Sequence, residues 1–284
     1  MFSPSSLLSN EGSDGGVAGS TLAAEQCTAG PHMSNSKKLN PIEKLAYRIL
    51  KLTDIDNITL RNAVRRFAES VPPSAKLLDA GAGLKPYEQF FQHCVYESCD
   101  FADCERFYSN IDDGRRDNIA SRHTYICPVD KIPVPENTYD FILCTEVLEH
   151  VPYPLAVLKE FYRILKSGGK VFVSVPQGYG IHGEPYNFFY FTKFGLELSL
   201  KEAGFEVLQM QERGGYFYYL YDRLANAIPR VVVGYKKQMS LMMIALSPIH
   251  LFLAYVLGPA LLILEPLDRE KRFTMGYVST ALKR

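Results

Sequence analysis

Short apolar runs alternate with amphipathic stretches from about residue 75 to residue 211. Strands alternating with helices in this way are typical of a parallel sheet covered by helices on both faces. The apolar runs predict strands at residues 77–79, 95–100, 124–128, 139–144, 170–175 and 205–211, and the amphipathic stretches predict helices at 86–91, 155–165 and 192–203. Ser167, Gly168 and Gly169 predict a turn into the fifth strand.

The same patterns extend to both sides of this region. Apolar residues recur at helical spacing in residues 41–52 and again after Asn57, until Pro72 and Pro73 end the second helix. Residues 273–282 have the pattern of one more strand. We expect this last strand to pair antiparallel beside the strand at 205–211.

Composition divides the chain into five segments. Residues 1–38 are rich in Ser, Gly and Ala without periodicity, which predicts a disordered leader or tag and no secretory signal. Residues 30–33 look like a protease-and-cloning scar, with Met33 as the native start; a natural flexible tail is the alternative. The other segments are an N-terminal helical cap (39–74), a core (75–213), an apolar helical insertion (214–271) and the last strand (272–284).

The insertion contains the most unusual stretch of the sequence. Residues 239–264 are uncharged and strongly apolar, and by length they could cross a bilayer. A single crossing would leave the last strand on the wrong side of the membrane. Three interpretations stay open: an interfacial helical hairpin with a basic flank, an apolar lid or homodimer surface, or additional core. The first two favour a lipophilic or lipid-linked acceptor.

Charge and cysteine content exclude some classes of function. The chain has 31 basic and 31 acidic residues, so we expect no nucleic-acid partner. Its six cysteines form no C-x-x-C pair, which favours reduced thiols over zinc or a disulfide framework. The expected location is cytoplasmic, or peripheral at a membrane.

The first predicted strand ends in the sequence Asp-Ala-Gly-Ala-Gly, residues 79–83. Two closely spaced glycines permit a ligand to approach the backbone, and a helix N-terminus would follow. The motif is neither a P-loop nor the dinucleotide fingerprint G-x-G-x-x-G, which argues against a nicotinamide oxidoreductase. Asp79 would repel a pyrophosphate but suits a cationic amine, and S-adenosylmethionine has one.

Five motifs together carry a resemblance to a known family. They are Leu-Leu-Asp-Ala-Gly-Ala-Gly (77–83), Pro-Val-Pro-Glu-Asn-Thr-Tyr-Asp (133–140), Glu-Val-Leu-Glu-His-Val (146–151), Leu-Lys-Ser-Gly-Gly (165–169) and Leu-Lys-Glu-Ala-Gly-Phe (200–205). In this order and spacing the chain resembles the class I S-adenosylmethionine-dependent methyltransferases of the small-molecule type. The implied fold class is α/β: a Rossmann-like doubly wound seven-stranded sheet with N-terminal helices and an apolar helical insertion before the last strand.

The resemblance implies positions for the cofactor, whose product is S-adenosylhomocysteine. Asp79, Gly81 and Gly83 would line its methionine end, and Asp100 would bind the ribose. Pro128 stands where the family often has an acid that holds the adenine amine, so Val129 and Asp130 are the candidates for that contact. Cys144 and Thr145 should face the sulfonium.

Methyl transfer is an in-line displacement that needs a base when the acceptor must lose a proton. His150 and His182 are the candidate bases, because histidine titrates near neutrality, and Glu149 is a third candidate catalytic residue. The alternative is that both histidines serve only in packing or capping.

The residues Glu146, Glu149 and His150 form an E-x-x-E-H element. It resembles the metal-binding element of small-RNA 2′-O-methyltransferases and of some quinone-precursor O-methyltransferases. Glu146 and Glu149 would share one face of a helical turn, with His182 as a fourth ligand. The same sequence also occurs in family members without a metal, and we expect no metal here.

The sequence thus predicts an enzyme that moves a methyl group from S-adenosylmethionine to an O or N nucleophile of a small-molecule or lipid-linked acceptor. The alternative function is a non-catalytic S-adenosylmethionine-binding or membrane-docking module. A membrane surface or a second copy of the chain, contacted through residues 239–264, is the expected macromolecular partner.

Overall fold

The computed structural model describes residues 54–101, 122–233, 246 and 248–284. The chain divides into two units, residues 1–38 and 39–284, and all described residues belong to the second. The helix predicted at residues 41–52 and the leader therefore lie outside the described residues. Among the residues that are described, no helix is both long and apolar enough to cross a membrane.

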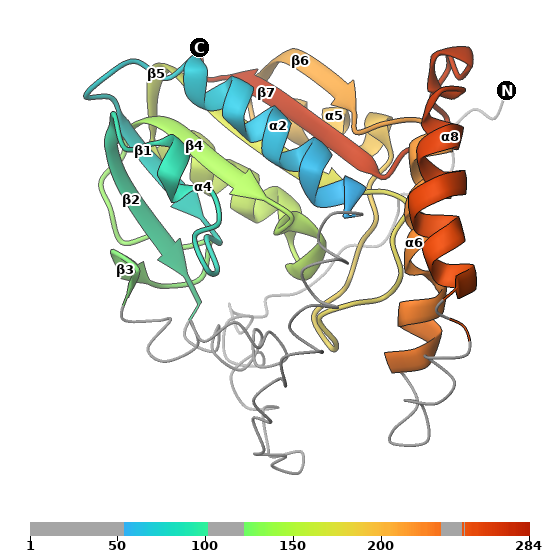
Figure 1. The fold of residues 1–284 in the computed structure, drawn as a ribbon. Helices are drawn as coiled ribbons and strands as arrows, with labels where there is room; N and C mark the ends of the chain where they lie inside the picture. Colours follow the sequence, from blue (N-terminus) through green and yellow to red (C-terminus); the bar gives the residue numbers. More distant parts are fainter. Residues whose placement is uncertain (1–53, 102–121, 234–245, 247) are drawn as a thin grey trace, which may run out of the picture. The chain divides into compact units, whose positions relative to one another are not determined.

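Seven strands form one sheet in the order β3-β2-β1-β4-β5-β7-β6 (Figure 1). Their bounds are β1 Lys76–Ala80, β2 Val95–Asp100, β3 Tyr125–Ile126, β4 Tyr139–Thr145, β5 Leu165–Pro176, β6 Glu206–Glu212 and β7 Gly276–Leu282. Strands β1 to β5 pair in parallel, and β7 runs antiparallel between β5 and β6. The predicted seven-stranded α/β sheet is confirmed, including its antiparallel last strand.

Helices cover both faces of the sheet (Figure 1). They are α2 Ile55–Glu69, α4 Pro154–Ile164 and α5 Lys193–Glu202, and single turns lie at Glu88–Phe90 (η1), Leu148–His150 (η3) and Glu265–Leu267 (η5). On one face Leu158, Phe161 and Leu200 of α4 and α5 pack on the strands; on the other face Val64 and Phe67 of α2 do so. Each helix therefore buries the apolar stripe that its periodicity predicted.

Between β6 and β7 the chain forms α6 Tyr216–Val233, the π-helical turn η4 Leu253–Leu257 and α8 Gly258–Leu262. Glu265 and Asp268 follow α8 and accept hydrogen bonds from the backbone N–H groups that begin α6. Free N–H groups at a helix start favour such acidic partners. The two ends of the insertion are thus joined beside the sheet.

Three local predictions differ from the structure. Residues 86–91 form only the single turn η1, Glu88–Phe90, which follows positive φ at Gly81, Gly83 and Lys85. The predicted turn at Gly168 is a bulge inside β5, where pairing moves from Tyr139–Leu165 to Phe141–Lys170. Helix α2 begins at Ile55, before Asn57, since the Asp54 side chain accepts a hydrogen bond from the Asn57 N–H.

Candidate active site

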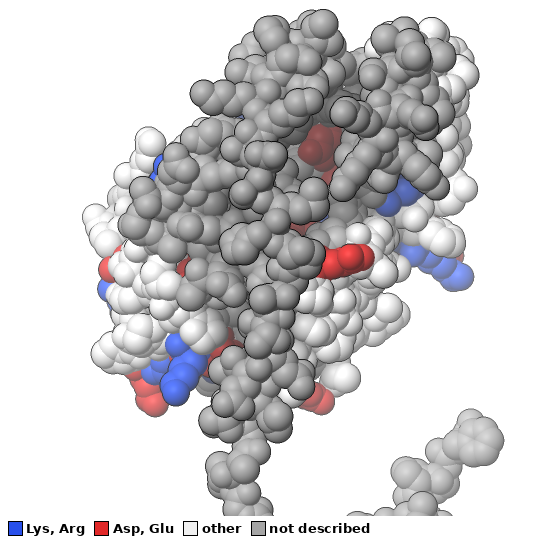
Figure 2. All heavy atoms as spheres, turned by 90° about the horizontal axis from the view of Figure 1, so that it is seen from below, with Lys and Arg blue, Asp and Glu red and all other residues white. Residues whose placement is uncertain are grey.

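A cavity of about 320 Å³ lies where β1, β2 and β4 end. Figure 2 views the molecule from that side, and acidic side chains lie in a hollow on this face. Residues from the ends of several strands line the cavity: Gly81, Asp100, Phe101, Pro128, Val129, Asp130, Glu146, Val147, His150, Val151, Pro152, Tyr153, Val157 and Tyr186. Ligands of open α/β sheets bind at this edge.

The glycine turn after β1 forms one wall of the cavity. Gly81 has φ +72°, and a Cβ built on it would come within 2.5 Å of the Val147 side chain. Gly83 has φ +52° and donates its backbone N–H to Asp100 Oδ2 at 2.6 Å. Glycine is needed at both positions for the left-handed backbone, and at Gly81 also for space.

Asp100 ends β2 and reaches into the cavity from the opposite side of this turn. Its two oxygens accept backbone N–H groups of Gly83, at 2.6 Å, and Phe101, at 2.8 Å. Burial raises the pKa of Asp100 to about 6, although these two hydrogen bonds oppose the shift. A carboxylate has about four acceptor positions, so capacity remains for ribose hydroxyl groups.

The other predicted cofactor residues fall into two sets. Val129 and Asp130 line the cavity with Gly81 and Asp100. Asp79, Gly83, Cys144 and Thr145 are not among its lining residues. Cys144 is fully buried in β4, and this burial raises the pKa of its thiol.

Asp79 lies beneath the glycine turn rather than on the cavity wall. Its Oδ2 accepts a hydrogen bond from the Tyr96 hydroxyl at 2.6 Å, while its buried Oδ1 has no hydrogen-bond partner among the described residues. Burial raises the pKa of Asp79 to about 7. A buried carboxylate oxygen without a hydrogen-bond donor favours a cationic partner over a neutral one. Asp100 therefore offers acceptor positions to ligand hydroxyl groups inside the cavity, whereas the buried Asp79 lies outside the lining of this cavity.

Three candidate catalytic residues lie together beyond Asp79. One oxygen or nitrogen atom from each side chain lies within 4.8 Å of the corresponding atoms of the other two; the three residues are Glu149, His150 and His182. His150 Nε2 is 3.6 Å from Glu149 Oε1, and the two imidazole centroids are 4.7 Å apart. The fold thus brings His150 of η3 next to His182, which lies 32 residues later in the sequence, in the loop after β5.

Both histidines have their Nδ1 atoms next to carbonyl oxygens. His182 Nδ1 is 3.0 Å from the Gly180 oxygen, and His150 Nδ1 bonds the Tyr186 oxygen. A carbonyl only accepts, so each Nδ1 carries the proton and each Nε2 presents its lone pair when the ring is neutral. Burial lowers the pKa of His150, which favours its neutral form.

Glu149 is the most deeply buried member of the cluster. Its side chain is 0% exposed, and neither oxygen has a hydrogen-bond partner among the described residues. Burial, with the charge of Glu146 as a second cause, raises the pKa of Glu149 well above its ordinary value. A buried carboxylate without donors is costly, and a proton or a cation would relieve that cost.

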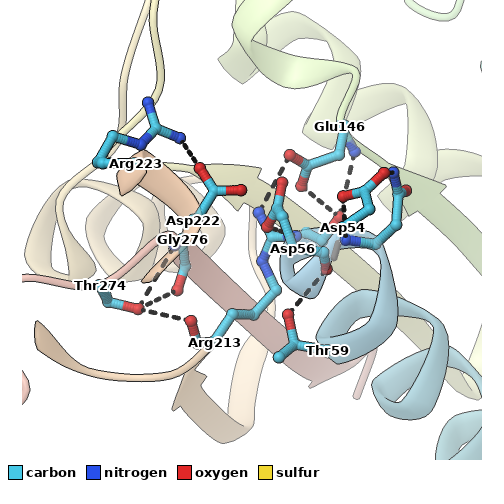
Figure 3. A network of polar contacts seen from close by, with 11 residues as sticks. Asp54, Asp56, Thr59, Glu146, Arg213, Asp222, Arg223, Thr274 and Gly276 are labelled. Carbon is cyan, nitrogen blue, oxygen red and sulfur yellow. Dashed lines mark hydrogen bonds and ion pairs between the residues drawn. The ribbon is translucent and has the colours of Figure 1, made fainter. Parts of the chain in front are cut away.

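The expectation that Glu146 shares a helical face with Glu149 is wrong. Glu146 has φ +52°, so the chain turns sharply before η3 begins. Its carboxylate instead accepts the Ser174 hydroxyl at 2.8 Å and pairs with Arg213 Nη2 at 3.1 Å (Figure 3). Glu146 is therefore not one of the three side chains that converge in the cluster, although its charge acts on Glu149.

Arg213 is a residue that the sequence did not single out. Its guanidinium is buried and bridges Glu146 to Asp56 of α2, with Nη1 3.0 Å from Asp56 Oδ1 (Figure 3). Gly276 gives it room, since a Cβ there would lie 2.5 Å from Nη2. Neither an arginine at the end of β6 nor a glycine at the start of β7 forms a motif, so only the fold reveals this contact.

Comparisons with known proteins found solved structures, curated relatives and a family model that are similar to this chain. The S-adenosylmethionine-dependent methyltransferase from Mesorhizobium loti is similar at 14% identity, with 78% of this chain and 96% of that chain covered and a TM-score of 0.46. The [4+2]-cyclase SpnF is similar at 19% identity, with 78% and 82% covered and a TM-score of 0.46.

The ubiquinone biosynthesis O-methyltransferase of Pseudomonas savastanoi pv. phaseolicola is 51% identical over 41 residues, which are 14% of this chain and 17% of that protein. The chain thus spans less than a fifth of the length of this curated relative. The model of a methyltransferase-domain family matches residues 57–210, more than half of the 284 residues. The chain therefore belongs to the methyltransferase family, in the class I group that uses S-adenosylmethionine.

Proposed function

We propose that this chain transfers a methyl group from S-adenosylmethionine to a hydroxyl oxygen of a small-molecule acceptor. The observation that carries the proposal is the convergence, within 4.8 Å, of one nitrogen from each of two imidazoles and one oxygen of a buried carboxylate that has no hydrogen-bond partner among the described residues. An alcohol or phenol must lose a proton to become a good nucleophile, and this cluster offers places for that proton. The name of the relative from Pseudomonas savastanoi, an O-methyltransferase, agrees with an oxygen acceptor.

In the proposed reaction the acceptor O–H gives its proton to Nε2 of His182. The oxygen lone pair forms the new O–CH₃ bond while the CH₃–S bond breaks, and the bonding electrons stay on sulfur as S-adenosylhomocysteine forms. His182 is partly exposed, so it can return the proton to solvent. The Glu149 carboxyl lies within 4.8 Å of both imidazoles, and its raised pKa lets it hold a proton within the cluster.

The cofactor in this proposal is held in the cavity, whose lining includes His150 of the cluster but neither Glu149 nor His182. Asp100 and the backbone of the glycine turn would hold the ribose and the methionine portion, and Val129 and Asp130 would contact the adenine. S-adenosylmethionine supplies the activated methyl group, and positioning of the acceptor in line with it supplies much of the acceleration.

One observation favours a second form of the same chemistry. Two imidazoles with their Nδ1 atoms next to carbonyl oxygens, beside a carboxylate, are a donor set that also suits a divalent cation. Glu149, His150 and His182 would hold such a cation, and it would lower the pKa of an acceptor hydroxyl. Loss of activity in EDTA, restored by Mg²⁺ or Zn²⁺, would identify this form.

A panel of phenols, aliphatic alcohols and primary amines tests the proposal, with methyl-labelled S-adenosylmethionine as donor. We expect labelled methyl ethers from one of the hydroxyl compounds, and loss of that product in His182→Ala. His93→Ala is the matched control, since His93 hydrogen-bonds the Val71 carbonyl far from the cluster in the fold. Labelling of amines alone, unchanged in His182→Ala, would refute the oxygen acceptor and the role of His182.

A further inference from the structure

The insertion between β6 and β7 presents two helical legs that lie side by side: α6 and the helical residues 248–262 (Figure 1). Gly215 donates its backbone N–H to Glu265 Oε1 and Tyr216 to Asp268 Oδ2, both at 2.6 Å. These hydrogen bonds fix the legs to each other at the end nearest the sheet. We call this pair of legs the helical hairpin.

One face of the second leg packs closely on α6. Ala254 and Gly258, four residues apart, are buried against Tyr221 and Ala225. A Cβ built on Gly258 would come within 2.2 Å of the Tyr221 ring, so the contact depends on a small residue there. Ile55 of α2 and Leu262 also pack against this cluster.

The opposite face of the same leg is apolar as well, but it is open. Ile249, Phe252 and Val256 recur at helical spacing with 53%, 54% and 57% of their surface exposed, and Ile263 continues the row at 77%. A helix that is apolar all round is normally buried on all sides. A continuous exposed apolar row of this kind marks an interaction surface.

The charges of the hairpin indicate what covers this row. From Arg223 to Leu264 the sequence contains no acidic residue; Arg223 pairs with Asp222, and the other cations of this segment are Arg230, Lys236 and Lys237. The whole chain is neutral, so this positive charge is segregated. A second copy would bring the same acid-free segment and no counter-charge for it. An anionic lipid surface offers both an apolar interior for the row and negative headgroups for the cations.

We propose that the exposed face of Ile249, Phe252, Val256 and Ile263 lies in the surface of a bilayer that contains anionic lipids. The positive charge of the acid-free segment selects those lipids, while Glu265 and Asp268 accept hydrogen bonds at the start of α6 and Asp222 is paired with Arg223. This proposal depends on none of the residues assigned to methyl transfer.

Co-sedimentation of the full chain with vesicles tests the proposal. We expect binding to vesicles of phosphatidylcholine mixed with phosphatidylglycerol, at least about tenfold stronger than to phosphatidylcholine alone, and weaker binding in high salt. The double variant Phe252→Ser with Val256→Ser should lose at least about tenfold in affinity for the mixed vesicles. Phe194→Ser on α5 is the matched control, because Phe194 is 78% exposed outside the hairpin, and it should bind as the wild type does.

Lys236→Glu combined with Lys237→Glu should remove the preference for anionic vesicles. Circular dichroism of each variant distinguishes a folding defect from a binding defect. We expect the double Ser variant to fold, because Phe252 and Val256 are both exposed. Equal vesicle binding by the double Ser variant and the wild type would overturn the proposal. Light scattering that shows a dimer abolished by the double Ser variant, without vesicle binding, would assign the face to a second copy instead.

Discussion

Two buried carboxylates, those of Asp100 and Glu149, lie at the same edge of the sheet and differ in what their oxygens bind. Each oxygen of Asp100 accepts a backbone N–H, whereas neither oxygen of Glu149 has a partner among the described residues. A carboxylate satisfied by backbone groups holds a loop in place; a carboxylate without donors is poised to take a proton or a cation. The first arrangement suits cofactor binding and the second suits chemistry on the acceptor.

Asp79 and Glu146 extend this comparison. Asp79 is half satisfied, with one oxygen on the Tyr96 hydroxyl and the other without a partner in the described part of the chain. Glu146 is held by Ser174 and Arg213, so the charge nearest Glu149 in sequence is already paired. The four acids at this edge of the sheet therefore differ in the groups that donate hydrogen bonds to their carboxylates, and we infer their different roles from those donors.

The largest expected effect is on turnover. Glu149→Gln and His182→Ala should each lower kcat by about 10²- to 10⁴-fold, because each removes part of the proton-accepting cluster. Single-turnover measurement with the hydroxyl acceptor checks this, and His93→Ala should keep the wild-type rate. A wild-type rate in both Glu149→Gln and His182→Ala would contradict the claim that Glu149, unlike Asp100, takes part in the chemistry on the acceptor.

Removal of the Arg213 charge should come next in size. Arg213→Met leaves the Glu146 and Asp56 carboxylates without their shared cation, and loss of one partner of a buried ion pair costs about 3 kcal/mol of unfolding free energy. Urea denaturation measures the change. Arg284→Met is the control, since the Arg284 side chain is 76% exposed on Glu206 and should contribute little. Equal changes in both variants would show that Arg213 is not the structural link between α2 and Glu146.

Taken per pH unit, the pH dependence of stability is the smallest of these effects, and it tests the half-satisfied Asp79. Its folded pKa is raised to about 7, so between pH 4 and 7 the native state binds the proton that the unfolded state has released. Stability should therefore fall as pH rises through this window, by at most about 1.4 kcal/mol per pH unit for one group. The charges of Asp100 and Glu88 reinforce the shift, and Lys85 opposes it.

Asp79→Asn should flatten this slope while Tyr96 stays buried. Thermal or urea unfolding at a series of pH values, compared between wild type and variant, gives the result. An unchanged slope would mean that Asp79 is ionised in the folded protein throughout the window. In that case its unpartnered oxygen would not explain a preference for a cationic amine.

Much of the sheet could be predicted from local sequence. The strands at Val95–Asp100 and Tyr139–Thr145 follow from apolar runs bounded by polar residues, and the structure has them within a residue of the expected limits. The antiparallel β7 also follows from its apolar pattern and its place at the end of the chain. Such elements are decided by burial of neighbouring residues, which a sequence displays directly.

The arrangement of the acids could be predicted only in part. The nearness of Glu149 to His182 was a hypothesis from motif resemblance, and the structure brings them together. The partner of Glu146 could not be found, because Arg213 lies 67 residues away in sequence and the left-handed backbone of Glu146 breaks the assumed helical spacing. Long-range ion pairs depend on topology rather than on periodicity.

Calorimetric titration of S-adenosylhomocysteine into wild type, Asp100→Ala and Glu149→Gln tests the central distinction most directly. The account predicts micromolar binding to the wild type, similar binding to Glu149→Gln, and binding to Asp100→Ala that is weaker by about tenfold or more, or about 1.4 kcal/mol. Binding that is weakened by Glu149→Gln and unaffected by Asp100→Ala would contradict it, since the roles of the satisfied and the unpartnered carboxylate would then be reversed.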